Sequence, residues 1–314
     1  MSSAFASQAN TAASFSLSST SDDVHVRSFS AEWVSDRSDI SWPYKSERDD
    51  GPAIGFRLSR DDGSSGGISG SSQVFFTNSA AFLFSYKMSK EISFDTSAGA
   101  ALYHVGVPDH DETDFIGGAK ASYVPAEGTY VFGGVERKLM IQDLQLINDL
   151  SDPMGVVEAY ETGYIDVFKG WQLQERVKRR WLNDGNTNWN NDLALMYKFS
   201  VYPTWFLLGF GGSYLSYSES STRYWTPTQV TSFGPRLDLA VPFKTDWTLK
   251  FGGSVSQTKE DSLDLSYGDW LRGALQYGNR DGKNFEVFVI DNRSSRSGSG
   301  WSGSTAGFTA NVQF

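Results

Sequence analysis

The chain contains no cysteine and only three histidines among its 314 residues. The lack of cysteine excludes a disulfide scaffold and any thiol-based catalytic or metal site. No apolar run approaches the roughly 18 residues that a membrane-spanning helix needs. The most hydrophobic stretch, residues 205–210, is far shorter. The first five residues have no basic segment and no sustained apolar segment, so they do not have the form of a secretory signal peptide.

Aromatic residues, by contrast, are abundant. They make up 15% of the chain, although hydrophobic residues as a whole reach only 39% and are scattered singly between polar ones. A transmembrane β-barrel needs this dilution, because its strands present alternate side chains to lipid and to the lumen. The formal net charge of −10 argues against nucleic acid and polyanionic cargo.

Alternation of apolar and polar residues recurs along the chain, and it is clearest at the end. There the apolar residues share one face, which we expect to contact the membrane: Phe308, Ala310, Val312 and Phe314. A terminal Phe closing such a strand resembles the C-terminal signature of bacterial outer-membrane barrels. The same period of two is found in residues 54–58, 92–102, 193–201, 233–241, 247–255 and 285–289.

Polar connections between these segments alternate in length. Short turns are expected near residues 90–91, 125–128, 169–170, 202–204, 244–246 and 279–283, and longer loops at 105–114, 140–154, 183–191 and 219–230. Outer-membrane barrels have tight periplasmic turns and longer outer loops. The first 80 residues allow two assignments: strands at 12–20 and 73–89, or strands at 24–34 and 68–76.

The predicted fold is therefore all-β: a transmembrane antiparallel up-and-down β-barrel of about 16 strands. Residues 1–314 form one domain, whose first ~20 residues could be a lead-in. A barrel of this size is too wide for side chains to fill and encloses an aqueous channel. The expected location is the bacterial outer membrane.

Charged and aromatic residues alternate on two consecutive predicted strands. In residues 155–169 the even positions would face the lumen, and the next strand continues with basic residues; further candidates lie on a later strand. The pore-lining candidates are Glu158, Tyr160, Tyr164, Asp166, Arg176, Lys178, Arg180, Arg236 and Asp238. Tyrosines and carboxylates suit a sugar polymer. A cross-strand lattice of ion pairs that stiffens the wall is the alternative, and both remain open.

The long loop at residues 140–154 contains apolar residues at a spacing that suits a short helix: Leu144, Leu146, Ile147 and Leu150. Folded inward, this helix would gate the pore. Left outside, it would pack on a neighbouring molecule.

His104, His110 and several acids gather in residues 104–114, a combination that could supply an Asp/His catalytic pair or a loose calcium site. The stretch lacks a nucleophile at a known spacing and the ligand spacing of a calcium loop. We expect no catalytic residue, no metal site and no cofactor, and interpret the stretch as a solvated acidic loop that divalent ions could bridge to lipopolysaccharide. An outer-membrane hydrolase barrel and a soluble lectin-like β-sandwich are the remaining alternatives.

The C-terminal third carries a family resemblance. Most of the resemblance lies in three segments: Tyr-Trp-Thr-Pro-Thr-Gln at 224–229, residues 232–242 with Gly-Pro-x-Leu-x-Leu, and the hairpin 247–258. Further support comes from residues 270–277, residues 285–290 and the terminal Phe314. The segment resembles exopolysaccharide-export porins, in which periplasmic tetratricopeptide repeats precede a 16-stranded barrel. Among these, acidity and length look most like the barrel of PelB.

The resemblance implies export of an exopolysaccharide in biofilm formation. The implied cargo is a neutral or cationic amino-sugar polymer such as Pel. The implied partners are membrane lipid, lipopolysaccharide, a periplasmic tetratricopeptide-repeat scaffold and a lipoprotein, and no nucleic acid. No such repeat lies in these residues, so we expect the C-terminal part of a longer precursor. A general diffusion porin is the alternative function.

Overall fold

The computed structural model describes residues 11–21, 24–35, 51–66, 72–89, 91–106, 109–126, 128–139, 154–201, 204–278, 283–295 and 301–313. These residues form sixteen β-strands. The strands are β1 (Thr11–Ser21), β2 (Val24–Ser35), β3 (Gly51–Gly66), β4 (Ser72–Lys87), β5 (Ile92–Gly106), β6 (Asp109–Ala126), β7 (Thr129–Leu139), β8 (Gly155–Phe168), β9 (Trp171–Leu182), β10 (Thr187–Ser200), β11 (Trp205–Tyr217), β12 (Val230–Lys244), β13 (Trp247–Glu260), β14 (Ser266–Tyr277), β15 (Lys283–Ser295) and β16 (Trp301–Gln313). In the part of the chain described, no helix is long and apolar enough to span a bilayer.

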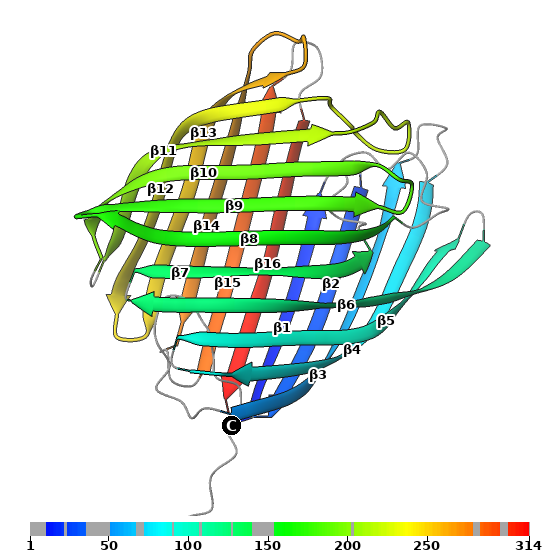
Figure 1. Ribbon diagram of the computed structural model, residues 1–314, viewed down its shortest axis with the longest axis horizontal. Coiled ribbons are helices and arrows are strands. Elements are labelled where there is room, and N and C mark those ends of the chain that lie inside the picture. Colours follow the sequence, from blue (N-terminus) through cyan, green and yellow to red (C-terminus); the bar gives the residue numbers. More distant parts are fainter. Residues whose placement is uncertain are drawn as a thin grey trace, which may run out of the picture.

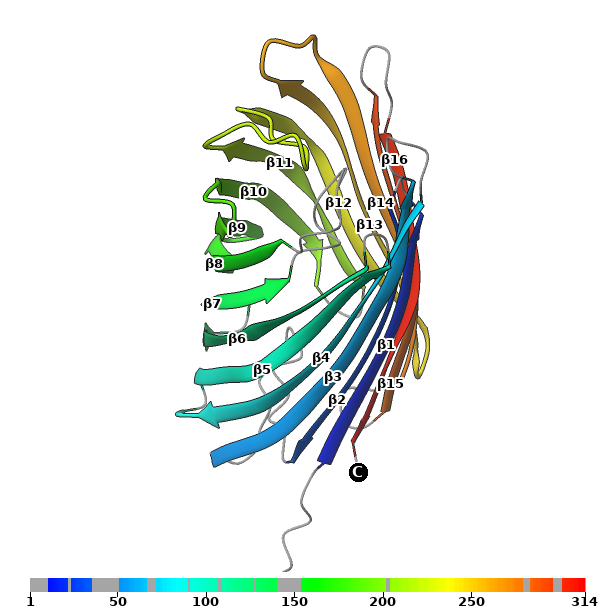
Figure 2. The same cartoon turned by 90° about the vertical axis from the view of Figure 1, so that its right-hand side faces the viewer.

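Each strand pairs antiparallel with its neighbours in the sequence, and β1 pairs with β16, so the sheet is a closed barrel (Figure 1). At this seam Phe15 lies opposite Ala310 and Leu17 opposite Phe308. Figure 2 shows β6–β11 facing β1–β4 and β14–β16 across the barrel. The predicted up-and-down barrel is confirmed, and the N-terminal ambiguity is resolved in favour of strands at residues 12–20 and 73–89.

The prediction of long loops at residues 105–114 and 183–191 is wrong. Residues 105–114 lie mostly in β5 and β6, which only residues 107–108 separate, and residues 187–191 belong to β10. Strands such as β6, with 18 residues, exceed the ~11 residues needed to cross the hydrocarbon, so their polar ends extend beyond it. Polar composition there marks the part of a hairpin outside the membrane, which sequence alone does not distinguish from a loop.

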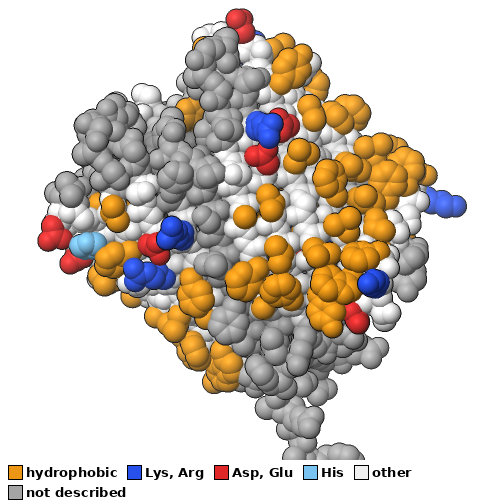
Figure 3. All heavy atoms as spheres, turned by 180° about the vertical axis from the view of Figure 1, so that it is seen from behind, with side chains coloured by type: hydrophobic (Ala, Val, Ile, Leu, Met, Phe, Trp, Pro, Cys, Tyr) orange, Lys and Arg blue, Asp and Glu red, His pale blue; other side chains and the backbone are white. Residues whose placement is uncertain are grey.

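The outer face of the barrel is apolar. Large hydrophobic side chains on alternate positions remain exposed; examples are Phe56, Leu58, Phe82, Phe84, Leu193, Leu195, Phe210, Phe233, Leu249, Phe251, Leu271, Leu275, Phe285, Val287 and Val289. Figure 3 shows such residues spread over one side of the barrel. Exposure of so many large apolar side chains is unfavourable in water and expected where a barrel meets lipid.

The C-terminal strand contributes to this outer face. The rings of Phe308 and Phe285 lie 5.8 Å apart, and Ala310 is opposite Phe285 in the register. The side chain of Val312 and the whole of Phe314 lie outside the described residues.

An aromatic belt follows the end of the barrel that bears the tight turns. Contacting rings, with centroids 4.9 to 6.4 Å apart, run through Phe168, Trp171, Tyr197, Phe199 and Phe206, and again through Phe243, Trp247 and Tyr277. Amphipathic rings are enriched at membrane interfaces, so the belt marks the periplasmic boundary. Trp205, at the start of β11, lies outside this belt and packs with Met196 and Leu207 on the inner face.

Candidate pore lining

The pore-lining candidates on β8 and β9 face the lumen together. The register pairs Glu158 with Arg180, Tyr160 with Lys178, and Asp166 with Gln172. Opposite residues of an antiparallel pair share one face of the sheet. The residues between them, such as Val157 and Ile165, therefore lie on the outer face.

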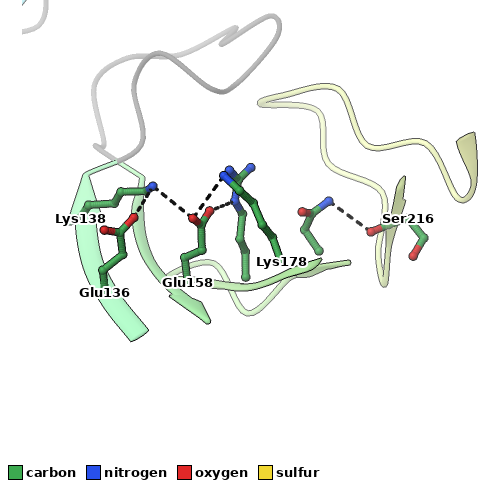
Figure 4. A network of polar contacts seen from close by, with 7 residues as sticks. Glu136, Lys138, Glu158, Lys178 and Ser216 are labelled. Atoms are coloured by element: carbon green, nitrogen blue, oxygen red, sulfur yellow. Dashed lines mark hydrogen bonds and ion pairs between the residues drawn. The ribbon is translucent and has the colours of Figure 1, made fainter. Parts of the chain in front are cut away.

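Glu158 is the centre of an ion-pair network on the inner wall (Figure 4). Its side chain is only 3% exposed, and Arg180 donates a hydrogen bond to Oε2. The ammonium groups of Lys138 and Lys178 each lie 3.4 Å from Oε1. Lys138 also binds Glu136 at 2.6 Å. One buried carboxylate is thus shared by three cations from β7 and β9.

Ion pairs recur around the inner wall. Lys198 contacts Asp166 at 2.5 Å, and Arg236 binds Asp192 through two hydrogen bonds. Other pairs on inward positions join Glu32 to Arg57, Asp95 to Lys120, and Glu286 to Lys250 and Arg272. Asp238 lies opposite Leu207 on the inner face of β12, two residues from Arg236. Most of the lumen-facing carboxylates predicted from the sequence therefore serve a cross-strand lattice.

The inner wall is wet. Several cations that point inward keep substantial exposure: 50% for Arg57, 36% for Arg272 and 34% for Lys250. A long charged side chain keeps this exposure only where water reaches it. Sixteen strands enclose more space than side chains fill, so the lumen holds water.

Four aromatic rings form a patch on the inner face of β7 and β8, here called the aromatic platform: Tyr130, Phe132, Tyr160 and Tyr164. Centroids lie 5.2 Å apart for Tyr130 and Phe132, and 6.1 Å apart for Phe132 and Tyr160. Tyr130 is directly opposite Tyr164, and the Lys120 ammonium lies 5.8 Å from the Phe132 centroid. Sequence reasoning missed Tyr130 and Phe132, although their alternation with Val131 would have placed them inward.

The β11–β12 loop, residues 218–229, is anchored to the inner wall at the end opposite the aromatic belt. Tyr224 is 3% exposed and packs with Val156 and Leu182, which face inward. Asn186 donates to the Tyr224 hydroxyl at 3.0 Å, and that hydroxyl donates to Asp184 at 2.9 Å. Burial, reinforced by Asp184, raises the pKa of the Tyr224 phenol. Tyr224 therefore anchors this loop to the inner wall.

The predicted gate, with Leu144, Leu146, Ile147 and Leu150, lies outside the described residues.

The stretch with His104 and His110 belongs to the β5–β6 hairpin. His104 is opposite Asp111, and its Nδ1 lies 2.8 Å from the Asp111 carboxylate. Within the described residues, no group of three His, Cys, Asp or Glu side chains is placed to hold a metal ion.

Comparison with solved structures identifies the same architecture. A structure described as a bacterial polysaccharide outer membrane secretin aligns with a TM-score of 0.71 and 10% identity, over 97% of this chain and 98% of that chain. CdiB from Acinetobacter baumannii aligns with a TM-score of 0.54 and 11% identity, over 97% of this chain and 60% of the CdiB chain. A deletion mutant of the monoaromatic hydrocarbon channel TodX aligns with a TM-score of 0.50 and 12% identity, over 98% of this chain and 91% of the TodX chain.

No protein-family model matches the chain, and no curated protein matches it by sequence. At these identities the likeness concerns the fold. The closed barrel and its apolar exterior are those of a transmembrane β-barrel, and they place the chain in the bacterial outer membrane.

Proposed function

We propose that this chain forms the channel through which a polysaccharide crosses the outer membrane during export. The observation that carries the proposal is the aromatic platform in a wet, polar lumen. Aromatic faces take up the apolar faces of pyranose rings, and phenol hydroxyls exchange hydrogen bonds with sugar hydroxyls. The structural likeness to a polysaccharide secretin supports the proposal at the level of the fold.

Of the two cargo classes expected from the sequence, a neutral polymer is favoured over a cationic one. A cationic amino-sugar such as that of Pel needs free carboxylates, but Glu158 is enclosed by Lys138, Lys178 and Arg180, and Asp166 binds Lys198. A cationic cargo would have to displace these side chains. A neutral polymer needs no such exchange.

The remaining elements of the family resemblance belong to this proposal. They are a role in biofilm formation, a periplasmic tetratricopeptide-repeat scaffold, a lipoprotein partner and contact with lipopolysaccharide. A general diffusion porin is the second candidate, and it is favoured by the density of ion pairs around the lumen. The two differ in whether neutral sugar oligomers bind the wall.

Block of conductance by neutral oligosaccharides in planar bilayers tests the proposal. Substituting Tyr130→Ala or Phe132→Ala removes a ring, which we expect to weaken block about fivefold per ring, since an aromatic contact contributes roughly 1 kcal/mol. Tyr123→Ala is the matched control, because Tyr123 is 46% exposed and lies on the outer face. A conducting channel that sugar oligomers do not block, or block equally in all three variants, would favour the diffusion porin.

A further inference from the structure

The inner face of β9 carries three consecutive inward cations, Arg176, Lys178 and Arg180. Residues two apart on a strand are separated by about 6.6 Å, so the three side chains form a ladder along the lumen wall. The residue between the first two, Val177, faces lipid. Lys138 on β7 joins the ladder through its contact with Glu158.

Charge on this part of the wall is not balanced. The inner face of β7–β9 bears four cations (Lys138, Arg176, Lys178 and Arg180) and three carboxylates (Glu136, Glu158 and Asp166), and Asp166 binds Lys198 of β10.

The next inward carboxylate, Asp192, lies opposite Arg176 but is engaged by both guanidinium nitrogens of Arg236. Among the described residues, Arg176 makes no ion pair and is exposed. Arg176 is therefore the cation of the ladder that is free to meet a solute.

Lys178 also retains binding capacity. Its ammonium approaches Glu158 at 3.4 Å, beyond the usual length of a hydrogen bond, and its side chain is 26% exposed. Figure 4 shows Lys138, Glu158 and Lys178 converging from neighbouring strands at the wall. Guanidinium and ammonium groups bind carboxylate, phosphate and sulfate oxygens, and a low-dielectric wall behind them concentrates their field in the lumen.

We infer that Arg176 and Lys178, with Lys138 beside them, form an oxyanion-binding step on the lumen wall, so that the channel favours anions although the whole chain carries a net charge of −10. The inference rests on the proposed passage through the lumen and adds the charge preference of that passage. The ligand class is a carboxylate, phosphate or sulfate group of a solute in the lumen.

The first test uses the full chain in planar bilayers under a potassium chloride gradient. We expect a reversal potential of the sign that reports chloride preference. Arg176→Gln with Lys178→Gln should lower the chloride-to-potassium permeability ratio by on the order of tenfold. Arg179→Gln is the matched control: Arg179 is on the same strand but on the outer face, where its guanidinium lies 5.1 Å from the Trp181 ring. Cation preference in the unmodified channel, or an unchanged ratio in the double variant, would overturn the inference.

A second test does not depend on passage. Calorimetric titration of the detergent-solubilised protein with sodium sulfate, and separately with a glucuronate oligosaccharide, measures oxyanion binding and compares the free ion with a sugar-borne carboxylate. We expect binding of at least one probe, weakened in the double variant and kept in Arg179→Gln. A protein that does not conduct would refute the proposed function, whereas a protein that conducts but binds neither probe would refute only the oxyanion step.

Discussion

Replacing Glu158 by Gln removes the carboxylate that three cations share, without changing the size of the side chain. Arg180 is the partner that suffers most, because its side chain is only 8% exposed and cannot turn towards water. Removing one member of a buried ion pair costs about 3–5 kcal/mol, because the remaining charge stays buried and loses its main counter-charge. Lys138 and Lys178, at 33% and 26% exposure, can turn into the lumen and add little.

We therefore expect Glu158→Gln to lower the free energy of unfolding by about 3 kcal/mol, the low end of that range. Urea unfolding of the barrel reconstituted in lipid vesicles, followed by tryptophan fluorescence and by heat-modifiable gel migration, measures the change. Asp166→Asn is the matched control. Its partner Lys198 is 14% exposed, but Asp166 itself is 33% exposed, so the loss should stay near 1 kcal/mol.

A double-mutant cycle isolates the interaction itself. Because Glu158→Gln leaves Arg180 charged and buried, Arg180→Gln added to it should recover part of the lost stability. Equal losses in Glu158→Gln and Asp166→Asn would show that burial of the network contributes nothing, and the description of Glu158 as its centre would be wrong.

Two further substitutions probe the barrel wall. Glu161 is exposed on the outer face near the middle of β8, opposite Gly133 and Val177. Glu161→Leu should therefore raise the free energy of unfolding in lipid by about 1–2 kcal/mol. Unchanged or lower stability of this variant would argue against lipid contact at Glu161. Gly170 has a φ of 81°, and an added Cβ would lie 2.9 Å from the Tyr197 ring, so Gly170→Ala should lower the free energy of unfolding by more than the roughly 1–2 kcal/mol that a left-handed non-glycine residue costs. Gly185 has a φ of 90° and open space around the added Cβ, so Gly185→Ala should cost only that amount. Equal unfolding midpoints for the two variants would contradict the predicted clash with Tyr197.

The sequence predicts most of the fold because alternation is a local property. The inward positions of Glu158 to Asp166 and of Arg176 to Arg180 follow from the period of two on either side of one tight turn. Partners contributed by other hairpins could not be predicted in this way. The contact of Lys138 with Glu158 depends on the register across a long connection. The contact of Arg236 with Asp192 joins two residues that are 44 positions apart in the sequence, on β12 and β10.

Trp205 shows how alternation fails after an irregularity. The register between β10 and β11 shifts between Lys198 and Ser200, so the side of the sheet on which β11 begins cannot be predicted by counting residues along the chain.

The net charge of the whole chain is likewise a poor guide to the charge of the lumen. The net charge of −10 includes residues outside the lumen, whereas the inner wall of β7–β9 carries a local surplus of cations.

The seam between β1 and β16 has a consequence for biogenesis. The two strands that meet there are the first and the last in the described chain, so the ring of hydrogen bonds is completed by partners almost the full chain length apart. Until β16 arrives, β1 and the strand that precedes β16 both present unpaired amides and carbonyls, which hydrocarbon does not tolerate. Insertion into the bilayer and joining of the two ends must therefore proceed together, and a chain that stops short of β16 has no stable partial form in the membrane.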